Sequence, residues 1–370
     1  MLGKKSHATS AWWACLASLG IMLVAMLPAC GKSSNTVIIG ASNFLVFCSN
    51  AGGNVSAFVA NGTSGALATV SGSPFAADMQ PHSIATDSKG QFLYVANLGS
   101  GDVSAYSINS STGVLTQASG SPIAAGSGPI AVAVDPSGQF VYVANQNSSD
   151  VSAYSIGSGG ALTAIGAPIA TDPNPRALAI ERTGKYLYVV AGLSAISEFS
   201  ISGTGTLAAS GTAFLSTTTA TAVAADPAGN FLYVTDAGNN NRVLGFSIDT
   251  TNGVLSPLGS SFSTDTGPGS VAVDRGGKFV FVANSTTGTI SAFSLDAASG
   301  NLTAVNGSPF ASGGTGPVGV AVDPTGSFLY TANSGSGDVS ELKINTSTGA
   351  LSAVGNFTTG SSATAVVAAP

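Results

Sequence analysis

The amino-acid sequence contains few charged side chains. Asp, Glu, Lys and Arg make up 8% of its 370 residues, whereas an ordinary globular protein has about 25%. The formal net charge is −6, and Lys and Arg form no extended run. Because nucleic-acid-binding proteins concentrate positive charge on one surface, the sequence predicts no nucleic-acid partner.

Cysteine and histidine are also scarce. After residue 29 the chain contains only Cys30, Cys48 and His82 of these two types. Two cysteines cannot build the disulfide framework of a small secreted protein. Cys48 lies in the apolar run "FLVFCSN" with no basic neighbour, which favours an inert buried thiol over a nucleophile. The chain has no Gly-x-Ser-x-Gly elbow, His-rich metal motif, P-loop or EF-hand spacing, so we expect no metal ion and no cofactor.

The chain begins with the pattern of an export signal. Lys4 and Lys5 precede an apolar run over residues 11–27 that is too short for a confident membrane-spanning helix. The run ends in "LPAC", which resembles the lipobox of bacterial lipoproteins. The resemblance implies cleavage before Cys30 and acylation of that cysteine. The alternative is a secreted protein whose signal happens to end near a cysteine.

We therefore expect a signal peptide over residues 1–29 and a polar tether over residues 30–42. Gly31 is not the Asp that retains lipoproteins at the inner membrane, so the resemblance implies an anchor in the outer membrane of the bacterial cell envelope. Lipid chains hold a protein at a bilayer surface without threading it through. We expect the lipid anchor to be the only contact with the membrane.

One sequence unit recurs seven times, with copies starting near residues 43, 91, 139, 185, 230, 278 and 327. Each copy has an aromatic run such as "QFLYVAN", an alternating run such as "DVSAYSI", a short strand such as "GVLTQA", and an apolar run such as "IAVAVDPSG". These runs read as four strands bounded by turn residues. Seven such units predict an all-β fold over residues 43–370, a seven-bladed β-propeller of four-stranded antiparallel blades.

Two features of the repeat have structural explanations. The "DPSG" and "DPTG" segments fit type I turns, so Asp135, Asp226 and Asp323 have a structural role and are not metal ligands. Two apolar runs, over residues 36–42 and 363–369, compete to complete the first blade. We expect the C-terminal run to do so, because joining both chain ends in one blade leaves no open edge.

One position in each unit is expected to line the central channel. It lies five residues before the turn aspartate or its equivalent, and the seven residues are His82, Ile130, Arg176, Thr221, Gly269, Val318 and Thr364. Of these, only His82 and Arg176 can carry charge. Arg176 would hold a carboxylate or phosphate by its planar guanidinium, and His82 would act as a general base toward water. Alternatively, His82 bonds to water or a backbone carbonyl, and Arg176 is solvated or paired with Glu181.

The repeats resemble those of the seven-bladed lactonase family, which includes bacterial 6-phosphogluconolactonases and carboxymuconate lactonising enzymes. The segments "YVAN" and "YVTD" equally resemble the YVTN surface-repeat propellers. The resemblance covers roughly residues 43–370. "QPHS" (80–83) matches the His-Ser motif of the lactonases, and "NPRALAIERTGKYLYVVAGL" (174–193) resembles a second conserved segment, in which Arg176 is kept. The resemblance implies hydrolysis of a lactone without a cofactor.

The chain departs from the lactonase pattern at several charged positions. Ala177, Ala191 and Gly192 stand where the family has histidine, asparagine and glutamate, and Asp102 and Ala237 stand where it has arginines. The loss of cations argues against a phosphorylated substrate. Location outside the cytoplasm argues against it too.

Two classes of function remain. The first is an envelope lactone hydrolase that uses His82 and Arg176 on an uncharged or singly charged lactone. The second is a non-catalytic propeller, expected to be monomeric, that binds a saccharide-like ligand, a small metabolite or a surface protein. A shared pocket with a carboxylate such as Glu181 or Asp102 orienting the imidazole would favour the enzyme. A channel plugged by Ile130 and Val318 would favour the binding protein.

Overall fold

The computed structural model describes residues 43–192, 195–215, 219–238 and 240–370. By its internal contacts the chain divides into one unit over Met1–Asn35 and a second over Thr36–Pro370. The predicted signal peptide, Cys30, the tether and the apolar run over residues 36–42 lie outside the described residues.

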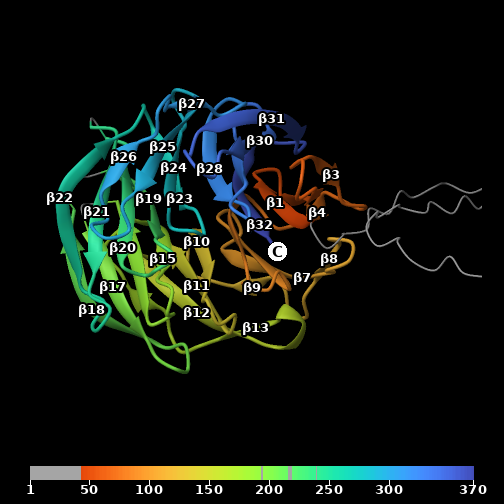
Figure 1. Cartoon of the computed structure of the whole chain (residues 1–370). Coiled ribbons are helices and arrows are strands. Elements are labelled where there is room, and N and C mark those ends of the chain that lie inside the picture. Colours follow the sequence, from red (N-terminus) through yellow and green to blue (C-terminus); the bar gives the residue numbers. More distant parts are fainter. Residues whose placement is uncertain (1–42, 193–194, 216–218, 239) are drawn as a thin grey trace, which may run out of the picture. The chain divides into compact units, whose positions relative to one another are not determined.

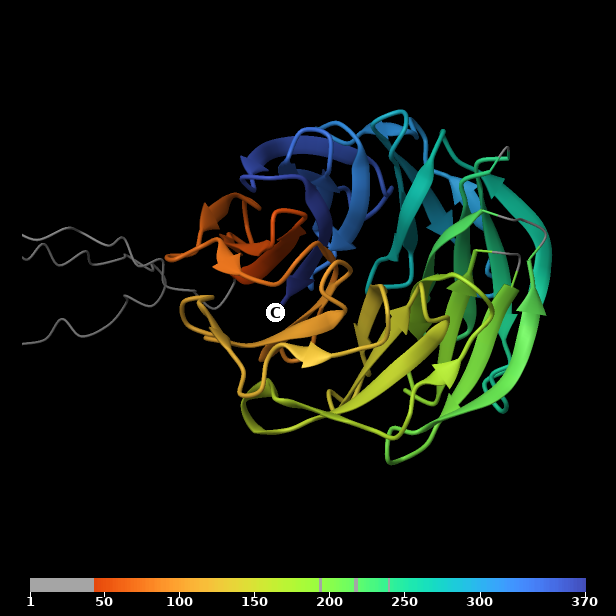
Figure 2. The same ribbon diagram turned by 180° about the vertical axis from the view of Figure 1, so that it is seen from behind.

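The described part of the second unit forms seven antiparallel sheets arranged as blades around a central axis (Figures 1 and 2). The innermost strand of each blade contacts the innermost strands of the blades on both sides, which closes the ring. These strands are β5 (Pro81–Thr86), β10 (Pro129–Val134), β15 (Pro175–Ile180), β19 (Ala220–Ala225), β23 (Pro268–Val273), β28 (Pro317–Val322) and β32 (Ala363–Ala369).

The second strand of each blade carries the aromatic repeat and is almost wholly buried. These strands are β1 (Phe44–Asn50), β6 (Phe92–Asn97), β11 (Phe140–Asn145), β16 (Tyr186–Ala191), β20 (Phe231–Asp236), β24 (Phe279–Asn284) and β29 (Phe328–Asn333). Such strands are buried on both faces because each blade packs against two neighbours, so they read as near-continuous apolar runs.

The third strand of each blade carries the alternating run. These strands are β2 (Asn54–Ala60), β7 (Asp102–Ile108), β12 (Asp150–Ile156), β17 (Ala195–Ile201), β21 (Arg242–Ile248), β25 (Thr289–Leu295) and β30 (Asp338–Ile344).

The outermost strand takes two forms. In three blades it is continuous, as β18 (Leu207–Phe214), β22 (Leu255–Ser263) and β31 (Leu351–Thr358). In the other four blades it is split into two short pieces that pair with the same third strand. The pieces are β3 (Leu67–Thr69) with β4 (Phe75–Ala76), β8 (Leu115–Gln117) with β9 (Ile123–Ala124), β13 (Leu162–Ala164) with β14 (Ile169–Ala170), and β26 (Leu302–Ala304) with β27 (Phe310–Ala311). A short 3-10 turn, η1 (Ser158–Gly160), precedes β13.

The C-terminal strand completes the first blade. β32 pairs antiparallel with β1, from Leu45 opposite Ala369 to Asn50 opposite Ala363. The prediction of a seven-bladed propeller closed by the C-terminal run is therefore confirmed. A strand from each chain end in one sheet removes the edges that an open ring would expose.

The buried tyrosines of the second strands tie neighbouring blades together. Tyr142 donates its hydroxyl hydrogen to the Gly205 carbonyl at 2.9 Å, and Tyr188 donates to the Gly253 carbonyl at 2.8 Å. Each acceptor lies in a turn of the next blade. A buried phenol needs such a partner. Each of these tyrosines therefore makes one hydrogen bond within an otherwise apolar interface between two blades.

The turn aspartates have the structural role predicted for them. Asp135 Oδ1 accepts hydrogen bonds from the backbone N–H groups of Gln139 and Phe140, at 2.8 and 2.6 Å. Asp226 and Asp323 make the same contacts in their blades. A carboxylate that accepts several backbone hydrogen bonds fixes the turn between the first and second strands of its blade.

Glu341 on β30 is a buried carboxyl group at a blade seam. Its side chain is 1% exposed, and neither carboxyl oxygen has a hydrogen-bond partner among the described residues. A Cβ atom on Gly65, in the adjoining blade, would lie only 1.5 Å from Oε1. The equivalent residue is alanine in several blades, including Ala105 and Ala292. Burial and the nearby Asp323 charge raise the pKa of Glu341 to about 7.

We expect Glu341→Gln to remove a pH dependence of stability. The folded state keeps the Glu341 proton up to about pH 7, while the unfolded chain loses it near 4.5. Stability therefore falls as pH rises between these values, by on the order of 3 kcal/mol, and stays level above them. Urea denaturation at both ends of this interval should show a drop in the wild type that shrinks in the variant. Asp249→Asn is the control, because the Asp249 carboxyl group is exposed. Equal drops in wild type and Glu341→Gln would contradict the assignment.

Candidate functional site

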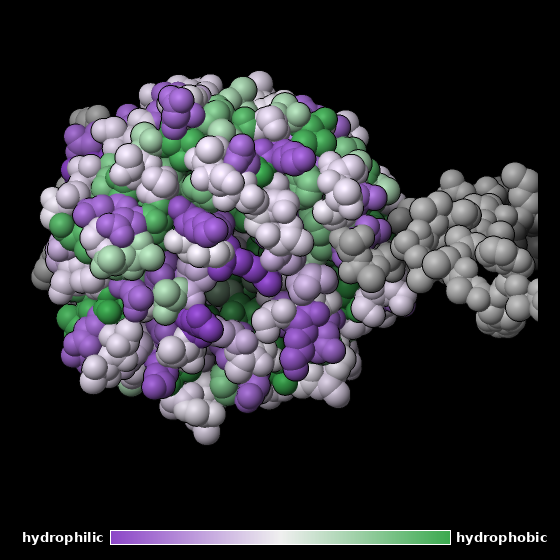
Figure 3. All heavy atoms as spheres, in the orientation of Figure 1, coloured by the Kyte–Doolittle hydropathy of each residue, from purple (hydrophilic) through white to green (hydrophobic). Residues whose placement is uncertain are grey.

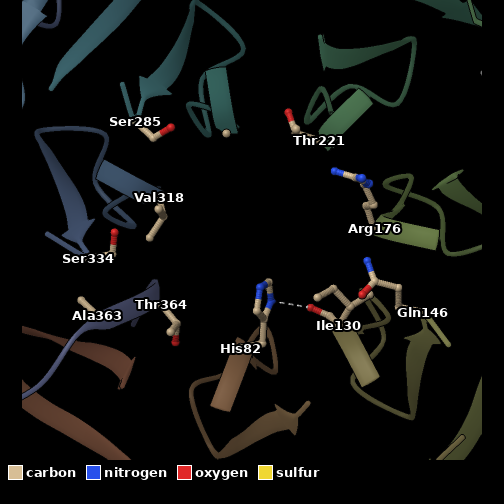
Figure 4. A pocket seen from close by; sticks show the side chains of 11 residues that line it. His82, Ile130, Gln146, Arg176, Thr221, Ser285, Val318, Ser334, Ala363 and Thr364 are labelled. Carbon is tan, nitrogen blue, oxygen red and sulfur yellow. Dashed lines mark hydrogen bonds between the residues drawn. The ribbon is translucent and has the colours of Figure 1, made fainter. Parts of the chain in front are cut away.

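The innermost strands surround a cavity of about 380 Å³. All seven positions selected from the repeat line it, namely His82, Ile130, Arg176, Thr221, Gly269, Val318 and Thr364. Figure 4 labels all of these except Gly269 and shows their side chains around one open space, and Figure 3 shows a hollow bordered mostly by hydrophilic side chains on one face of the ring. Ile130 and Val318 form part of the wall and leave the cavity open.

Each of the seven residues occupies a β-bulge at the start of its innermost strand. In β5, for example, Pro81 pairs with Asn97 and Ser83 pairs with Ala96, so His82 has no partner on the neighbouring strand. The same skipped residue occurs in the other six blades. A bulge re-aims the side chain of the extra residue. Each blade therefore directs one side chain, that of its bulged residue, into the cavity.

The alternative contact expected for His82, a hydrogen bond to a backbone carbonyl, does form, and it defines the tautomer of the ring. Its Nδ1 atom lies 2.9 Å from the backbone carbonyl oxygen of Ile130 in the next blade. A carbonyl oxygen only accepts, so Nδ1 carries the hydrogen and donates it. In the neutral ring, Nε2 is then left with a free lone pair. Surrounding protein atoms lower the pKa of His82 by desolvation, and the Ile130 carbonyl opposes this only in part. The imidazole is therefore neutral at pH 7, with Nε2 available as a base.

Arg176 enters the cavity from β15. Its Nε atom is buried and has no hydrogen-bond partner among the described residues. Gly192 leaves room beside it, since a Cβ atom there would lie 2.9 Å from Nε. Figure 4 shows the guanidinium group pointing into the open space, so its terminal nitrogens can donate hydrogen bonds to a ligand oxygen there.

The pair between Arg176 and Glu181 does not form. Glu181 replaces the turn aspartate of its blade, and its carboxylate accepts hydrogen bonds from the backbone N–H groups of Thr183 and Lys185 at 2.6 and 2.8 Å. Asp102 accepts a hydrogen bond from Asn97 at 2.7 Å. No carboxylate lies among the described residues that line the cavity, so neither Glu181 nor Asp102 orients His82.

A second set of cavity residues was not selected from the sequence. Gln146, Ser285 and Ser334 each follow directly after the last residue of a second strand. The preceding asparagine is buried, and Asn145, for example, donates to Asp150 and Ser152 at 2.7 and 2.9 Å. This bonding fixes the end of the strand. The residue after a "YVAN"-type segment would have pointed to these three, although Leu98 at the same position in another blade does not line the cavity.

The remaining chemistry-bearing groups are placed elsewhere. Cys48 is buried in β1, and desolvation raises the pKa of its thiol, which leaves it unreactive. Within residues 43–370, apart from the short gaps, no three His, Cys, Asp or Glu side chains are grouped to hold a metal ion. Within the part of the chain that the structure describes, no helix is long and apolar enough to cross a membrane.

Comparison with known proteins extends the fold assignment. A family model described as "Lactonase, 7-bladed beta-propeller" matches residues 25–128, 72–165, 119–214 and 174–311. A search of curated protein sequences finds no match.

Solved structures share the fold at low sequence identity. A putative 6-phosphogluconolactonase from Bacteroides uniformis has a TM-score of 0.78 and 20% identity, covering 88% of this chain and 99% of its own. A putative 6-phosphogluconolactonase from Bacteroides fragilis has a TM-score of 0.78 and 19% identity, covering 92% and 100%. The periplasmic gluconolactonase PpgL from Pseudomonas aeruginosa has a TM-score of 0.75 and 17% identity, covering 89% and 99%.

The family model spans most of the propeller, and the structure has the number of blades that its description gives. The chain therefore belongs to the family of seven-bladed β-propeller lactonases.

Proposed function

We propose that this protein hydrolyses a small lactone in the central cavity, with His82 as general base and Arg176 as the group that binds the reacting carbonyl. The supporting observation is the hydrogen bond from His82 Nδ1 to the Ile130 carbonyl. In many catalytic sites a carboxylate fixes the orientation and the tautomer of the histidine ring. Here the Ile130 carbonyl oxygen fixes both. The lone pair on Nε2 then remains for a water molecule.

These two residues account for the proton transfers and for the charge that develops during the hydrolysis. Water attacks the lactone carbonyl carbon while Nε2 of His82 takes its proton. The Arg176 guanidinium donates to the carbonyl oxygen, which becomes an oxyanion in the tetrahedral intermediate. The ring C–O bond then breaks, the leaving oxygen takes the proton from the imidazolium, and a hydroxy acid is formed. The same oxygen that Arg176 holds becomes part of the product carboxylate.

Replacing His82 should abolish most of the activity. We expect His82→Gln to lower kcat for lactone hydrolysis by about 10²–10⁴-fold, the usual contribution of a general base. In the wild type, kcat/KM should rise with pH and level off with a midpoint below 6.5, because His82 must be neutral and its pKa lies below that ordinary value. Titration of glucono-lactone hydrolysis in a pH-stat measures both effects.

Lys89→Gln is a matched control, since Lys89 is exposed in a turn of the same blade. Turnover that is insensitive to His82→Gln, or a midpoint above 7, would contradict the proposed role of His82.

The second candidate is a propeller that binds a ligand or a protein partner without chemistry. It is favoured by the lack of any carboxylate among the described cavity residues, because catalytic bases commonly have such a partner. The two candidates differ in one result. Absence of turnover on every lactone tested, with the cavity still binding small molecules, would identify a binding protein.

We also propose that the protein is exported and anchored in the bacterial cell envelope through a lipid on Cys30. The support is the positively charged start of the chain, the apolar run and the "LPAC" segment. One structural neighbour is a periplasmic protein.

Cys30→Ser should release the protein from the membrane. In cells fed a radiolabelled fatty acid, the wild type should be labelled and should sediment with the envelope, while the variant should be unlabelled. Cys48→Ser serves as the control, because that thiol is buried in the propeller. Labelling that persists in Cys30→Ser would show that Cys30 is not the acylated residue.

A further inference from the structure

The strand directions give the propeller two distinct faces. Each innermost strand begins at the cavity and ends at the turn that leads into the second strand. We call the side with the cavity the cavity face and the opposite side the turn face. The third strands pair antiparallel with the second strands, so they also end at the turn face. The turns that define the turn face lie at residues 87–91, 135–139, 181–185, 226–230, 274–278 and 323–327.

The exposed cations of the propeller all lie on the turn face. Residues 43–370 contain eight Lys and Arg side chains. Arg176 and Arg242 are on the cavity face, where Arg176 lines the cavity and Arg242 pairs with Asp236 at 3.1 Å. The other six are exposed, five in the turns of alternate blades and one near the end of β30. They are Lys89, Arg182, Lys185, Arg275, Lys278 and Lys343.

Most of the carboxylates on the turn face are buried. Asp87, for example, is 3% exposed and accepts hydrogen bonds from the backbone N–H groups of Gln91 and Phe92, each at 2.7 Å. The other five turn carboxylates are buried in the same way. Backbone donors stabilise such a charge from within the turn. The exposed carboxylates of the described turn face are Asp249 and Asp296. Cations therefore dominate the exposed charge of this face.

The cavity face has the opposite charge. Its carboxylates stand at the ends of second strands, at the starts of third strands, or just before innermost strands. These residues are Asp78, Asp102, Asp150, Asp172, Asp236, Asp265 and Asp338. An anionic surface would therefore attract the turn face and repel the cavity face.

The chain also enters the propeller on the turn face. Leu45 near the start of β1 lies opposite Ala369 near the end of β32. A Cβ atom on Gly90, in the turn over residues 87–91, would lie 2.7 Å from the Pro370 carbonyl oxygen. β1 therefore begins at the turn face. An extended chain spans about 3.3–3.6 Å per residue, so the segment from Cys30 to β1 spans at most about 45 Å. An anchor on Cys30 would keep the turn face close to the bilayer.

We infer that the turn face docks on an anionic phospholipid bilayer through its six exposed cations, so that the cavity opens away from the lipid. The inference rests on the proposed anchoring and adds a second membrane contact to the lipid, which the sequence alone predicts as the only one. Folding gathers onto one face cations that form no run in the sequence. A lipid chain combined with a basic patch attaches a protein more stably than the chain alone.

Lysine acylation of the full chain on vesicles tests the inference. A membrane-impermeant acylating reagent and mass spectrometry give the rate at each lysine, on neutral phosphatidylcholine vesicles and on vesicles with one-third phosphatidylglycerol. We expect Lys89, Lys185 and Lys278 to react at least about fivefold more slowly on the anionic vesicles. The difference should disappear in about 1 M salt, where the Debye length is about 3 Å. Equal rates on both kinds of vesicle would overturn the inference.

A reporter lysine on the cavity face is the internal control. Ser100→Lys places a lysine in an exposed turn of that face, and its rate should be the same on both kinds of vesicle. Slowing of this lysine to the same extent as Lys89 would show docking without the inferred orientation. Slow reaction of the turn-face lysines without vesicles, growing with protein concentration, would identify a second copy of the chain as the partner. Either result would overturn the inference.

Two matched double variants separate the face from the net charge. Arg182→Gln with Arg275→Gln removes two exposed charges from the turn face. Docking should weaken by about 25-fold, which is fivefold or about 1 kcal/mol for each cation, and the lysine rates should approach those on neutral vesicles. Asn147→Asp with Thr286→Asp makes the same change in net charge at exposed turns of the cavity face, and should leave the lysine rates as in the wild type. Equal effects of the two variants would overturn the inference.

Failure of this inference is distinguishable from failure of the proposed anchoring. Sedimentation of the vesicles in alkaline carbonate tests the anchor, because it removes proteins that are held by charge alone. A protein that stays with the vesicles but shows equal lysine rates keeps the anchor and loses the docking face. A protein that is released by carbonate but shows slowed turn-face lysines on anionic vesicles before the wash keeps the docking face and loses the anchor.

Discussion

The pairing of β32 with β1 is the interaction on which the rest of the structure depends. It joins residues from the two ends of the propeller in one sheet, and only then do seven innermost strands form a closed ring. Thr364 shows the consequence locally, because its hydroxyl oxygen lies 2.9 Å from the carbonyl oxygens of both Ser49 and Pro81 and can donate its one hydrogen to either. Without the closing strand, the cavity would lack one of its seven walls, and the first blade would expose an unpaired edge.

Because the ring is closed, every blade has an equivalent inward-facing position. The β-bulge at that position turns the side chain of the extra residue toward the cavity. The extra residue of each bulge faces the cavity, so one substitution per blade sets the chemistry without disturbing the seams between blades. In this chain most of those positions hold Ile, Val, Gly or Thr. Of the seven, only His82 and Arg176 can carry a charge. The scaffold of the lactonase family is kept.

Backbone carbonyl oxygens accept many of the hydrogen bonds made by the side chains that line this cavity. The Ile130 carbonyl sets the tautomer of His82, and the carbonyls of Gly267 and Gly316 hold the hydroxyl hydrogens of Ser285 and Ser334. These links join one blade to the next or one strand to its neighbour. The contact with Ile130 uses the one N–H group of the neutral His82 ring and leaves Nε2 as its acceptor nitrogen.

The repeat predicts the blades, their closure and the seven inward positions because strands and turns follow local residue patterns. The contacts of those residues do not follow from such patterns. The bond from His82 to Ile130 joins residues of two blades and depends on the shape of both bulges. Gln146, Ser285 and Ser334 were missed because their position is set by buried asparagines rather than by hydrophobic periodicity. The pairing proposed for Glu181 was wrong because the turn uses that carboxylate.

Determining which ring nitrogen of His82 carries the hydrogen tests this mechanism most directly. Nitrogen-15 NMR of the full chain distinguishes Nδ1–H from Nε2–H imidazoles, and the chain has only two histidines to assign. The mechanism predicts that neutral His82 carries its hydrogen on Nδ1 and titrates with a pKa below its ordinary value. A neutral His82 protonated on Nε2 would have its lone pair on Nδ1, which faces the Ile130 carbonyl and not the cavity water, and would contradict a catalytic role for this residue.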